Sequence, residues 1–278
     1  MGHRVRMRWV AIAVTLVLTG CGTPETPAAS GPSVAAPSDL ATQAPPPASP
    51  TPPPNRRATP VKVAIFGDSQ ATALFDTRPS TVTRSLRLSD QSISACGILR
   101  GRVVSRSGEH FDLVGACPNW LSAWRADAHR VKPDIALVVI GAWDVFDLKT
   151  KSKTLTFGTP DWDAAFLKQL RSGVGALRSS GAQVALAELP CYRPRKSNPR
   201  PPGWWPERGE DDRTRHVNDL LRQITDGSHV FTVTPPGTFC TDKSVGDNPK
   251  YRYDGVHYLQ PGAKLWFGAV IPQLLVLP

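Results

Sequence analysis

The pattern of apolar and polar positions divides the chain into three parts. One apolar run lies near the N-terminus, and a long polar and proline-rich stretch follows it. From Val61 onward, short apolar runs alternate with stretches of helical periodicity. Alternation of this kind predicts an α/β fold in which a mostly parallel sheet carries helices on both faces.

Four apolar runs predict the strands of this sheet. Val61–Phe66 predicts the first strand, and Ile135–Ile140 is a continuous run of the kind found in strands buried on both faces. Val184–Leu189 predicts another buried strand, and Val230–Val233 predicts a short one. The predicted helices are Ala71–Leu88 with an interruption near Pro79, Trp162–Arg178, Asp212–Ile224, and Pro261–Leu275 with a late break at Pro272.

The N-terminal apolar run predicts an export signal. Three arginines precede Trp9–Leu18, a run too short to remain as a membrane span. Leu18-Thr19-Gly20-Cys21 resembles the lipobox of bacterial lipoproteins, which implies cleavage before Cys21 and acylation of Cys21. We therefore expect residues 1–20 to be a signal peptide and the protein to be lipid-anchored at the outer face of a bacterial cytoplasmic membrane. An ordinary secretory signal with an incidental cysteine is the alternative.

Residues 21–60 predict a tether rather than a domain. They are dense in Pro, Ala, Ser and Thr and cannot bury a core. An extended, proline-rich tether of this length spans on the order of 100 Å, and this reach suits an enzyme that works in a cell wall above its membrane. A solubilising linker is the alternative. The remaining residues, 61–278, have the length and apolar content of one domain.

Four cysteines lie in the predicted domain. An even number in an exported chain indicates two disulfides with three pairings, of which we favour Cys96–Cys117 and Cys191–Cys240. The first pairing closes a short loop, and the second joins a basic, proline-rich segment to the loop before the C-terminal stretch. A zinc site is the competing interpretation, but the spacings contain no C-x-x-C knuckle.

The net charge of +10 is concentrated partly in the segment from Cys191 to Glu210, which also contains Trp204 and Trp205. Basic residues beside aromatic ones occur in nucleic-acid-binding proteins, but an exported lipoprotein is not expected to meet nucleic acid. Tryptophans also stack on sugar rings, so Trp204 and Trp205 are candidate substrate contacts. The alternative is a solvated loop over the sheet edge, anchored by its tryptophans.

Gly67-Asp68-Ser69 stands where the first predicted strand ends and a helix begins. Ligands of parallel sheets bind outside the carboxyl ends of the strands. Glycine permits a sharp turn, and the backbone N–H groups at a helix start point toward whatever lies beside Ser69. Ser69 is therefore a candidate nucleophile whose own N–H faces an oxyanion, and Asp68 orders the turn.

A serine nucleophile needs a base, and His257 is the candidate. It lies in Tyr253-Asp254-Gly255-Val256-His257-Tyr258, just before the last predicted helix. Asp254 precedes it by three residues, so one loop can present both side chains. The carboxylate of Asp254 would hold the imidazole tautomer and stabilise the imidazolium.

The first block, Gly67-Asp68-Ser69, and the last, Asp254-Gly255-Val256-His257, resemble those of the SGNH (GDSL-type) hydrolases. The resemblance covers roughly Val61 to the C-terminus. It implies a three-layer, flavodoxin-like α/β/α sandwich and ester chemistry with Ser69 as nucleophile, His257 as base and Asp254 as its partner. We expect a monomer that uses no cofactor and no metal.

Two further blocks of that family supply oxyanion donors. Gly97 matches the first of them. For the second, Gly-x-Asn-Asp, this chain has Gly141-Ala142-Trp143-Asp144, so Trp143 replaces the asparagine. An indole N–H is one donor and does not simply replace an amide. Asp68, Trp143 and Asp144 are further candidate substrate contacts.

The variation at Trp143 resembles SGNH domains fused to acyltransferase-3 membrane proteins in actinobacteria, and so do Asp211-Asp212, Arg213 and Asn218. That resemblance implies a free-standing, lipid-anchored version that adds or removes acyl groups on envelope glycans. We therefore expect a serine esterase or O-acyltransferase. A glycan-binding or assembly module on the same fold, with chemistry blocked at Trp143, is the second hypothesis.

Overall fold

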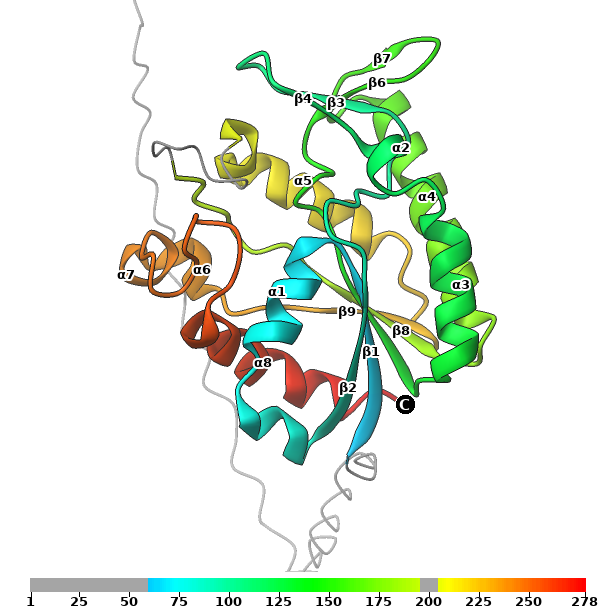
Figure 1. Ribbon diagram of the computed structural model, residues 1–278, viewed down its shortest axis with the longest axis vertical. Helices are drawn as coiled ribbons and strands as arrows, with labels where there is room; N and C mark the ends of the chain where they lie inside the picture. The colour runs from blue at the N-terminus through cyan, green and yellow to red at the C-terminus, as the bar shows by residue number, and fades with distance from the viewer. Residues whose placement is uncertain (1–59, 196–204) are drawn as a thin grey trace, which may run out of the picture. The chain divides into compact units, whose positions relative to one another are not determined.

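The computed structural model describes residues 60–195 and 205–278, and within them the chain is built on a five-stranded parallel sheet (Figure 1). The strand order is β2-β1-β5-β8-β9. The strands are β1 Val61–Gly67, β2 Leu86–Ser92, β5 Ile135–Val139, β8 Gln183–Ala187 and β9 Val230–Val233. Gly67 pairs with Ser92 on one side and with Val139 on the other, so the carboxyl ends of three strands meet at one edge.

Helices cover both faces of this sheet, as the sequence predicts. The helices are α1 Ser69–Thr77 and α8 Gln260–Leu274 on one face, and α3 Trp120–Val131, α4 Pro160–Arg178 and α5 Asp211–Arg222 on the other. Strand β1 shows why: Val63 and Ile65 pack with α1 and α8, while Ala64 and Phe66 pack with α3 and α4. The period-2 alternation of a strand with two apolar faces thus gives a three-layer α/β/α sandwich.

A second, antiparallel sheet of order β4-β3-β6-β7 lies above the carboxyl edge of the first (Figure 1). Its strands are β3 Arg102–Val104, β4 His110–Asp112, β6 Asp147–Lys149 and β7 Thr154–Leu155. The other short elements are η1 Ser80–Arg84, α2 Leu113–Ala116, η2 Pro206–Gly209, α6 Thr238–Thr241 and α7 Lys243–Gly246. None of these was predicted, because segments of two to five residues carry no periodic signal.

The helix expected over Ala71–Leu88 is wrong in its second half. Helix α1 ends at Thr77, before Pro79, and the chain then forms η1 and strand β2. Proline lacks the N–H that would continue the helix and restricts the residue before it. Strand β2 lies at the sheet edge and only Leu86 of it is buried, so its sequence lacks the apolar run of a central strand.

The expected break at Pro272 does not occur, since α8 continues to Leu274. Proline inside a helix removes one hydrogen bond and costs roughly 3 kcal/mol. Here the last turn is held by Gln273, whose side chain exchanges two hydrogen bonds with the backbone of Thr234, at 2.9 and 2.8 Å. This contact to the end of β9 compensates for the bond lost at Pro272.

One disulfide joins Cys96 to Cys117 and the other joins Cys191 to Cys240, which is the pairing favoured from the sequence. The first fixes the chain after β2 against α2, and the second fixes the chain after β8 against α6. Cys21, the predicted signal peptide and the predicted tether up to residue 59 lie outside the described residues, so these predictions are not tested here.

Within the described ranges, no helix combines the length and the apolar character needed to cross a membrane.

Candidate active site

The turn after β1 requires glycine at position 67. Gly67 has φ +142°, and a Cβ there would lie 1.8 Å from the carbonyl oxygen of Val139. The next residue, Asp68, donates its N–H to that same oxygen at 3.2 Å. Its side-chain Oδ1 accepts the N–H of Gln70 at 2.8 Å and so caps α1. Strand β1 therefore ends in a turn of fixed geometry, with Asp68 ordering it as predicted.

Ser69 is the first residue of α1 and lies at the carboxyl edge of the sheet. Its Oγ is 2.7 Å from Nε2 of His257. Its backbone N–H donates to no acceptor among residues 60–195 and 205–278, as is usual for the first turn of a helix. Hydroxyl and backbone donor are therefore presented at one place.

Asp254 holds His257 from the other side. Its Oδ2 is 2.7 Å from Nδ1 of His257, and its Oδ1 accepts the N–H groups of Val256 and His257 at 2.9 and 2.7 Å. Burial raises the pKa of Asp254, but the hydrogen bonds and charge of His257 and the backbone N–H of Val256 outweigh burial and leave the pKa below its usual value. An ionised Asp254 fixes the tautomer with hydrogen on Nδ1, which leaves Nε2 to accept the proton of Ser69.

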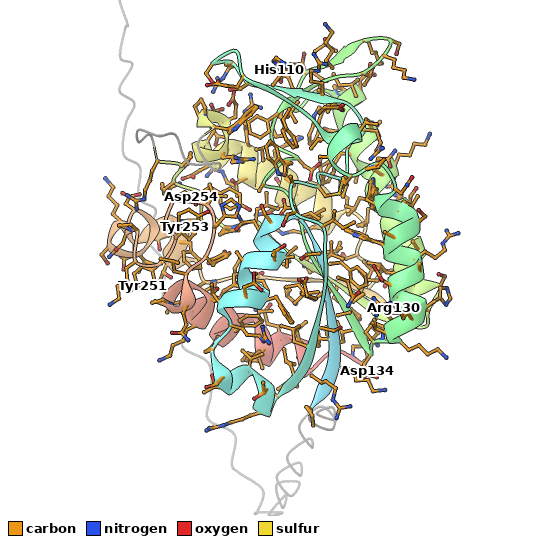
Figure 2. All side chains as sticks on the ribbon, in the orientation of Figure 1. His110, Arg130, Asp134, Tyr251, Tyr253 and Asp254 are labelled. Atoms are coloured by element: carbon orange, nitrogen blue, oxygen red, sulfur yellow. A yellow bond between two sulfur atoms is a disulfide. The ribbon has the colours of Figure 1, made fainter. Side chains whose placement is uncertain are left out.

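The loop that carries Asp254 and His257, in which Figure 2 labels Tyr253 and Asp254, is closed at its base. Arg252 and Tyr258 form an antiparallel bridge across it. The buried guanidinium of Arg252 donates to the carbonyl of Cys191 at 2.8 Å, next to the second disulfide. Gly255 has φ +83°, and a Cβ there would meet the carbonyl oxygen of Arg193 at 1.5 Å. The loop therefore packs tightly on the chain that follows β8.

A pocket of about 220 Å³ opens beside Ser69 and His257. Its walls come from the chain after β1, β2 and β5, from η2 and from the loop before α8. The lining residues are Ser69, Ser94, Ala95, Ala142, Trp143, Arg208, Val256 and His257. This is the place that parallel-sheet topology predicts for a ligand.

Trp143 lines this pocket but is held by other aromatic side chains. Its ring stacks on Phe111 with centroids 4.5 Å apart and meets the edge of Trp205 at 5.6 Å. Gly97 lies against it, since a Cβ at position 97 would come within 3.0 Å of the Trp143 Cβ. Gly97 is not among the residues that line the pocket, so its role as an oxyanion donor stays a prediction.

Two of the predicted substrate contacts, Asp68 and Asp144, have no exposed surface, so neither carboxylate can reach a ligand in this structure. Oδ1 of Asp144 accepts the N–H groups of Ile98 and Leu99 at 3.1 and 3.3 Å and so braces the loop after β2. Burial, together with the charge of Asp68, raises the pKa of Asp144 to about 7. Burial raises the pKa of Asp68 to about 6, although its hydrogen bond from Gln70 and the charge of His257 oppose this.

Two residues at the site were not singled out from the sequence. Arg208 is 2% exposed, and its guanidinium carbon lies 4.3 Å from the centre of the Trp143 ring. Tyr253 is exposed, and its ring stacks on that of His257 at 5.9 Å. Tyr253 stands in the motif itself and could have been noticed there. Arg208 could not, because no spacing relates it to Ser69 or His257.

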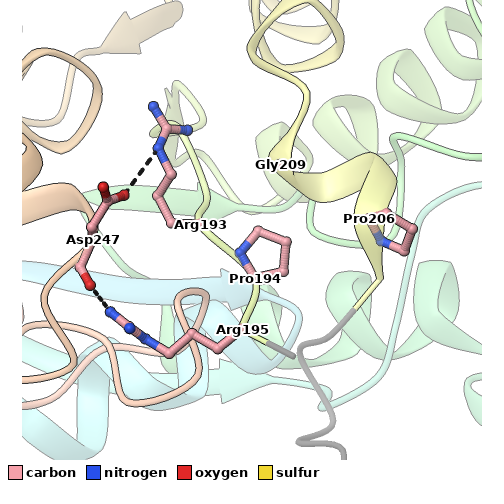
Figure 3. Close-up of a pocket in the computed structure, with 6 residues that line it drawn as sticks. All are labelled: Arg193, Pro194, Arg195, Pro206, Gly209 and Asp247. Carbon is pink, nitrogen blue, oxygen red and sulfur yellow. Dashed lines mark hydrogen bonds and ion pairs between the residues drawn. The ribbon is translucent and has the colours of Figure 1, made fainter. Parts of the chain in front are cut away.

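Two further arginines of the basic segment, Arg193 and Arg195, are paired within the part of the chain that the structure describes. Arg193 forms an ion pair with Asp211. It also pairs with Asp247, whose carbonyl accepts a hydrogen bond from Arg195 (Figure 3). Trp205 packs on Trp143 and Phe146, which agrees with an anchoring role. Trp204 lies outside the described residues, so its predicted substrate contact has no structural counterpart here.

Other polar side chains that the structure brings together do not form a second group in which a histidine ring joins a serine to a carboxylate among the described residues. His129 contacts Ser179 at 3.1 Å, but no carboxylate hydrogen-bonds to this histidine among the described residues. His216 pairs with Asp163 at 2.7 Å. Arg213 donates to the carbonyl of Val145. In the described ranges there is no cluster of His, Cys, Asp and Glu that could hold a metal ion.

Solved structures with a similar fold include SGNH- and GDSL-type proteins. A protein of Bacteroides fragilis assigned as an acylhydrolase is 14% identical, with a TM-score of 0.51 over 80% of this chain and 89% of that one. A GDSL-like lipase of Bacteroides thetaiotaomicron is 15% identical, with a TM-score of 0.49 over 77% and 87%. The periplasmic domain of a Salmonella Paratyphi A lipopolysaccharide acetyltransferase is 14% identical, with a TM-score of 0.49 over 77% and 83%. The likeness to the Bacteroides fragilis protein shows a shared α/β/α fold.

No curated protein matches the chain significantly. A family model does match, and its range includes Ser69, Gly97 and Trp143 but ends before Asp254 and His257. The family model is described as "Protein of unknown function (DUF459)", and it covers residues 62–201, half of the 278-residue chain. The chain therefore belongs to this family.

Proposed function

We propose that this protein is an SGNH-type serine esterase or O-acyltransferase that forms an acyl-enzyme on Ser69. One observation carries the proposal: Ser69, His257 and Asp254 are joined by hydrogen bonds of 2.7 Å and 2.7 Å beside a pocket at the carboxyl edge of the sheet. Ser69 has its backbone N–H at the first position of a helix, where an oxyanion is stabilised by donors and by the helix dipole.

The chemistry follows from these contacts. Ser69 Oγ attacks the carbonyl carbon of an ester, its proton passes to Nε2 of His257, and the carbonyl electrons move onto the oxygen. Asp254 stabilises the imidazolium without taking its proton. When the intermediate collapses, the leaving alkoxide takes the proton from His257, and the acyl group stays on Ser69. Water or a sugar hydroxyl, deprotonated by His257, then attacks the acyl carbonyl. The ester bond to Ser69 breaks, and His257 returns the proton to Ser69 Oγ.

The substrate and the location extend this proposal. We place the protein outside the cytoplasm, held by acylated Cys21 at the outer face of a bacterial membrane, where acyl esters of envelope glycans are its substrates. The two disulfides support an oxidising compartment. The exposed ring of Tyr253 beside His257 is a platform on which a sugar ring could stack.

Trp143 favours a second candidate, a glycan-binding or assembly module on the same fold. An aromatic side chain fills the place where the family resemblance predicts an amide donor, and the exposed ring of Tyr253 offers a sugar a stacking surface. If Trp143 blocks the chemistry, the protein binds a glycan and Ser69 stays unreacted.

Hydrolysis of p-nitrophenyl acetate separates the two candidates. For the esterase or acyltransferase, the wild-type protein releases p-nitrophenol, and Ser69→Ala lowers the rate by roughly 10³-fold or more. Ser179→Ala is the matched control, because it removes a hydroxyl that also contacts a histidine but lies far from the pocket. Equal turnover by wild type and Ser69→Ala would exclude Ser69 as the nucleophile.

A further inference from the structure

In the reaction proposed above, the carbonyl oxygen of the ester becomes negatively charged, and the backbone offers few hydrogen-bond donors to this oxygen. The N–H of Ser69 is one donor, and the N–H of Gly97 is a predicted second. The indole of Trp143 is sandwiched between Phe111 and Arg208 and packs edgewise on Trp205. Loss of one donor to an oxyanion typically costs roughly 10²–10³-fold in rate, so a further donor in this pocket would matter.

Arg208 is a cation in the wall of that same pocket. It lines the pocket together with Ser69 and His257. Its Nε donates to the carbonyl of Ala142 at 2.6 Å, and its guanidinium carbon lies 4.3 Å from the centre of the Trp143 ring. A guanidinium has five N–H groups in a fixed plane, so it can bind a carbonyl oxygen through one edge while another N–H faces a second oxygen.

The neighbours of Arg208 hold it in position before any substrate arrives. The carboxylate of Glu207 is 1% exposed and accepts hydrogen bonds from the hydroxyl of Ser105, at 2.8 and 3.0 Å, and from the backbone N–H of Arg106. These bonds fasten η2 to the small antiparallel sheet. The hydrogen bond to Ala142 and the contact with the Trp143 ring then hold the guanidinium itself, which is the preorganisation that electrostatic catalysis needs.

Arg208 also keeps its charge in this buried position. Burial lowers its pKa to about 10, while the charges of Asp68, Tyr192, Asp254 and Glu207 act in the opposite direction. At neutral pH the group is therefore cationic. A buried cation beside the nucleophile interacts with a developing negative charge much more strongly than an exposed one does.

We propose that the guanidinium of Arg208 is a catalytic oxyanion donor that takes the place of the amide missing at Trp143. This inference rests on the proposed function and names a residue that acts in it. As Ser69 Oγ bonds to the carbonyl carbon and its proton moves to His257, the carbonyl electron pair becomes an oxyanion. Arg208 binds that oxygen together with the N–H of Ser69, and releases it when the carbonyl reforms.

Steady-state kinetics with p-nitrophenyl acetate test this inference on the whole protein. Arg208→Met keeps the length and apolar contacts of the side chain but removes charge and donors. We expect kcat to fall roughly 10²–10³-fold while KM changes less than about threefold, because the interaction exists only in the transition state. This ester carries no anionic group, so a kcat within about threefold of wild type would overturn the inference and leave Arg208 at most a contact for anionic substrates.

Arg213→Met is the matched control. Arg213 donates to the carbonyl of Val145, three residues beyond Ala142, and so braces the same loop without lining the pocket. Its kcat is expected to stay within about threefold of wild type. If Arg213→Met loses as much kcat as Arg208→Met, the effect is loss of loop support, and the inference is wrong.

Arg208→Lys covers the case in which Arg208→Met does not fold. The ammonium keeps the charge but cannot bond to Ala142 and to the oxyanion in one plane, so we expect kcat to fall about tenfold with KM unchanged. A wild-type kcat in a folded Arg208→Lys protein would overturn the role of the guanidinium. Wild-type protein that neither hydrolyses the ester nor reacts at Ser69 would instead contradict the proposed function itself.

Discussion

Three buried carboxylates near the pocket show how residue-level environment separates function from support. Asp254 accepts from His257 and keeps a lowered pKa, whereas burial raises the pKa of Asp68 and of Asp144. The contact of Asp254 with His257 could be predicted, because its partner stands three residues away in the sequence. The burial of Asp144 could not, since its hydrogen-bond donors, Ile98 and Leu99, come from a loop distant in sequence.

Asp254→Asn tests the orienting role of this carboxylate. The amide oxygen can still accept the N–H groups of Val256 and His257, so the loop is expected to keep its fold. The amide NH₂ would face Nδ1 of His257 and favour the wrong tautomer, which places hydrogen on Nε2. We expect kcat for p-nitrophenyl acetate to fall roughly 10²–10⁴-fold with little change in the melting temperature. An active Asp254→Asn protein would show that His257 needs no orienting anion.

Asp144 gives a prediction for the pH dependence of stability. Its pKa is about 7 in the folded protein against 3.8 for an unperturbed group. As the pH rises, the unfolded state releases the proton first, so Asp144 lowers the free energy of unfolding between about pH 4 and 7, and the loss levels off above that. Urea unfolding at pH 5 and pH 8 should show that Asp144→Asn loses less stability over this interval than wild type, by on the order of 2 kcal/mol. Parallel pH dependences would contradict the raised pKa.

At the scale of elements, the site is made by loops at the carboxyl edge, and the sequence predicts them unequally. The central strands and long helices could be predicted because their apolar positions repeat over many residues. Edge strand β2 and segment η2 could not be predicted. Strand β2 buries only Leu86, and η2 buries the charged residues Glu207 and Arg208, so neither has an apolar pattern. Consequently Ser69 and His257 were predictable from motifs at the ends of long elements, whereas Arg208 was not.

Gly255→Ala tests how the loop before α8 is supported. A Cβ at this position would lie 1.5 Å from the carbonyl oxygen of Arg193, so the loop must move and carry His257 away from Ser69. We expect a loss of several kcal/mol in unfolding free energy and a loss of kcat of at least roughly 10²-fold, measured by urea unfolding and ester hydrolysis.

Gly181→Ala is the control for that prediction. Gly181 has nearly the same φ, +87° against +83°, but a Cβ there meets nothing within 4 Å. Gly181→Ala should therefore lower the free energy of unfolding only through backbone strain, by about 1 kcal/mol, and leave kcat unchanged. If both variants lose activity equally, the close contact at Gly255 does not position His257.

For the molecule as a whole, each disulfide joins a loop at the carboxyl edge of the sheet to a short helix. Cys191–Cys240 spans 49 residues and lies beside the Arg252 contact that supports the loop of His257, whereas Cys96–Cys117 spans 21. The cross-link that closes the longer loop restricts the unfolded chain more. The paired cysteines were predictable from their even number, but their place beside the site follows only from the fold.

Replacement of each cysteine pair by alanine tests this ranking. We expect Cys191→Ala/Cys240→Ala to lower the unfolding free energy by about 4 kcal/mol and Cys96→Ala/Cys117→Ala by about 3 kcal/mol. Urea unfolding under non-reducing conditions measures both. A wild-type protein whose unfolding is insensitive to reductant would contradict a stabilising role for either bond.

The central claim is that Ser69 is an activated nucleophile, and labelling with a fluorophosphonate tests it most directly. The reagent reacts with serines that a neighbouring base has activated, whatever the natural acyl group is. We predict a single label on the wild-type protein, mapped to Ser69 by mass spectrometry, and no label on Ser69→Ala or His257→Ala. A folded and oxidised wild-type protein that stays unlabelled, or that is labelled equally after Ser69→Ala, would contradict the account and favour the glycan-binding module.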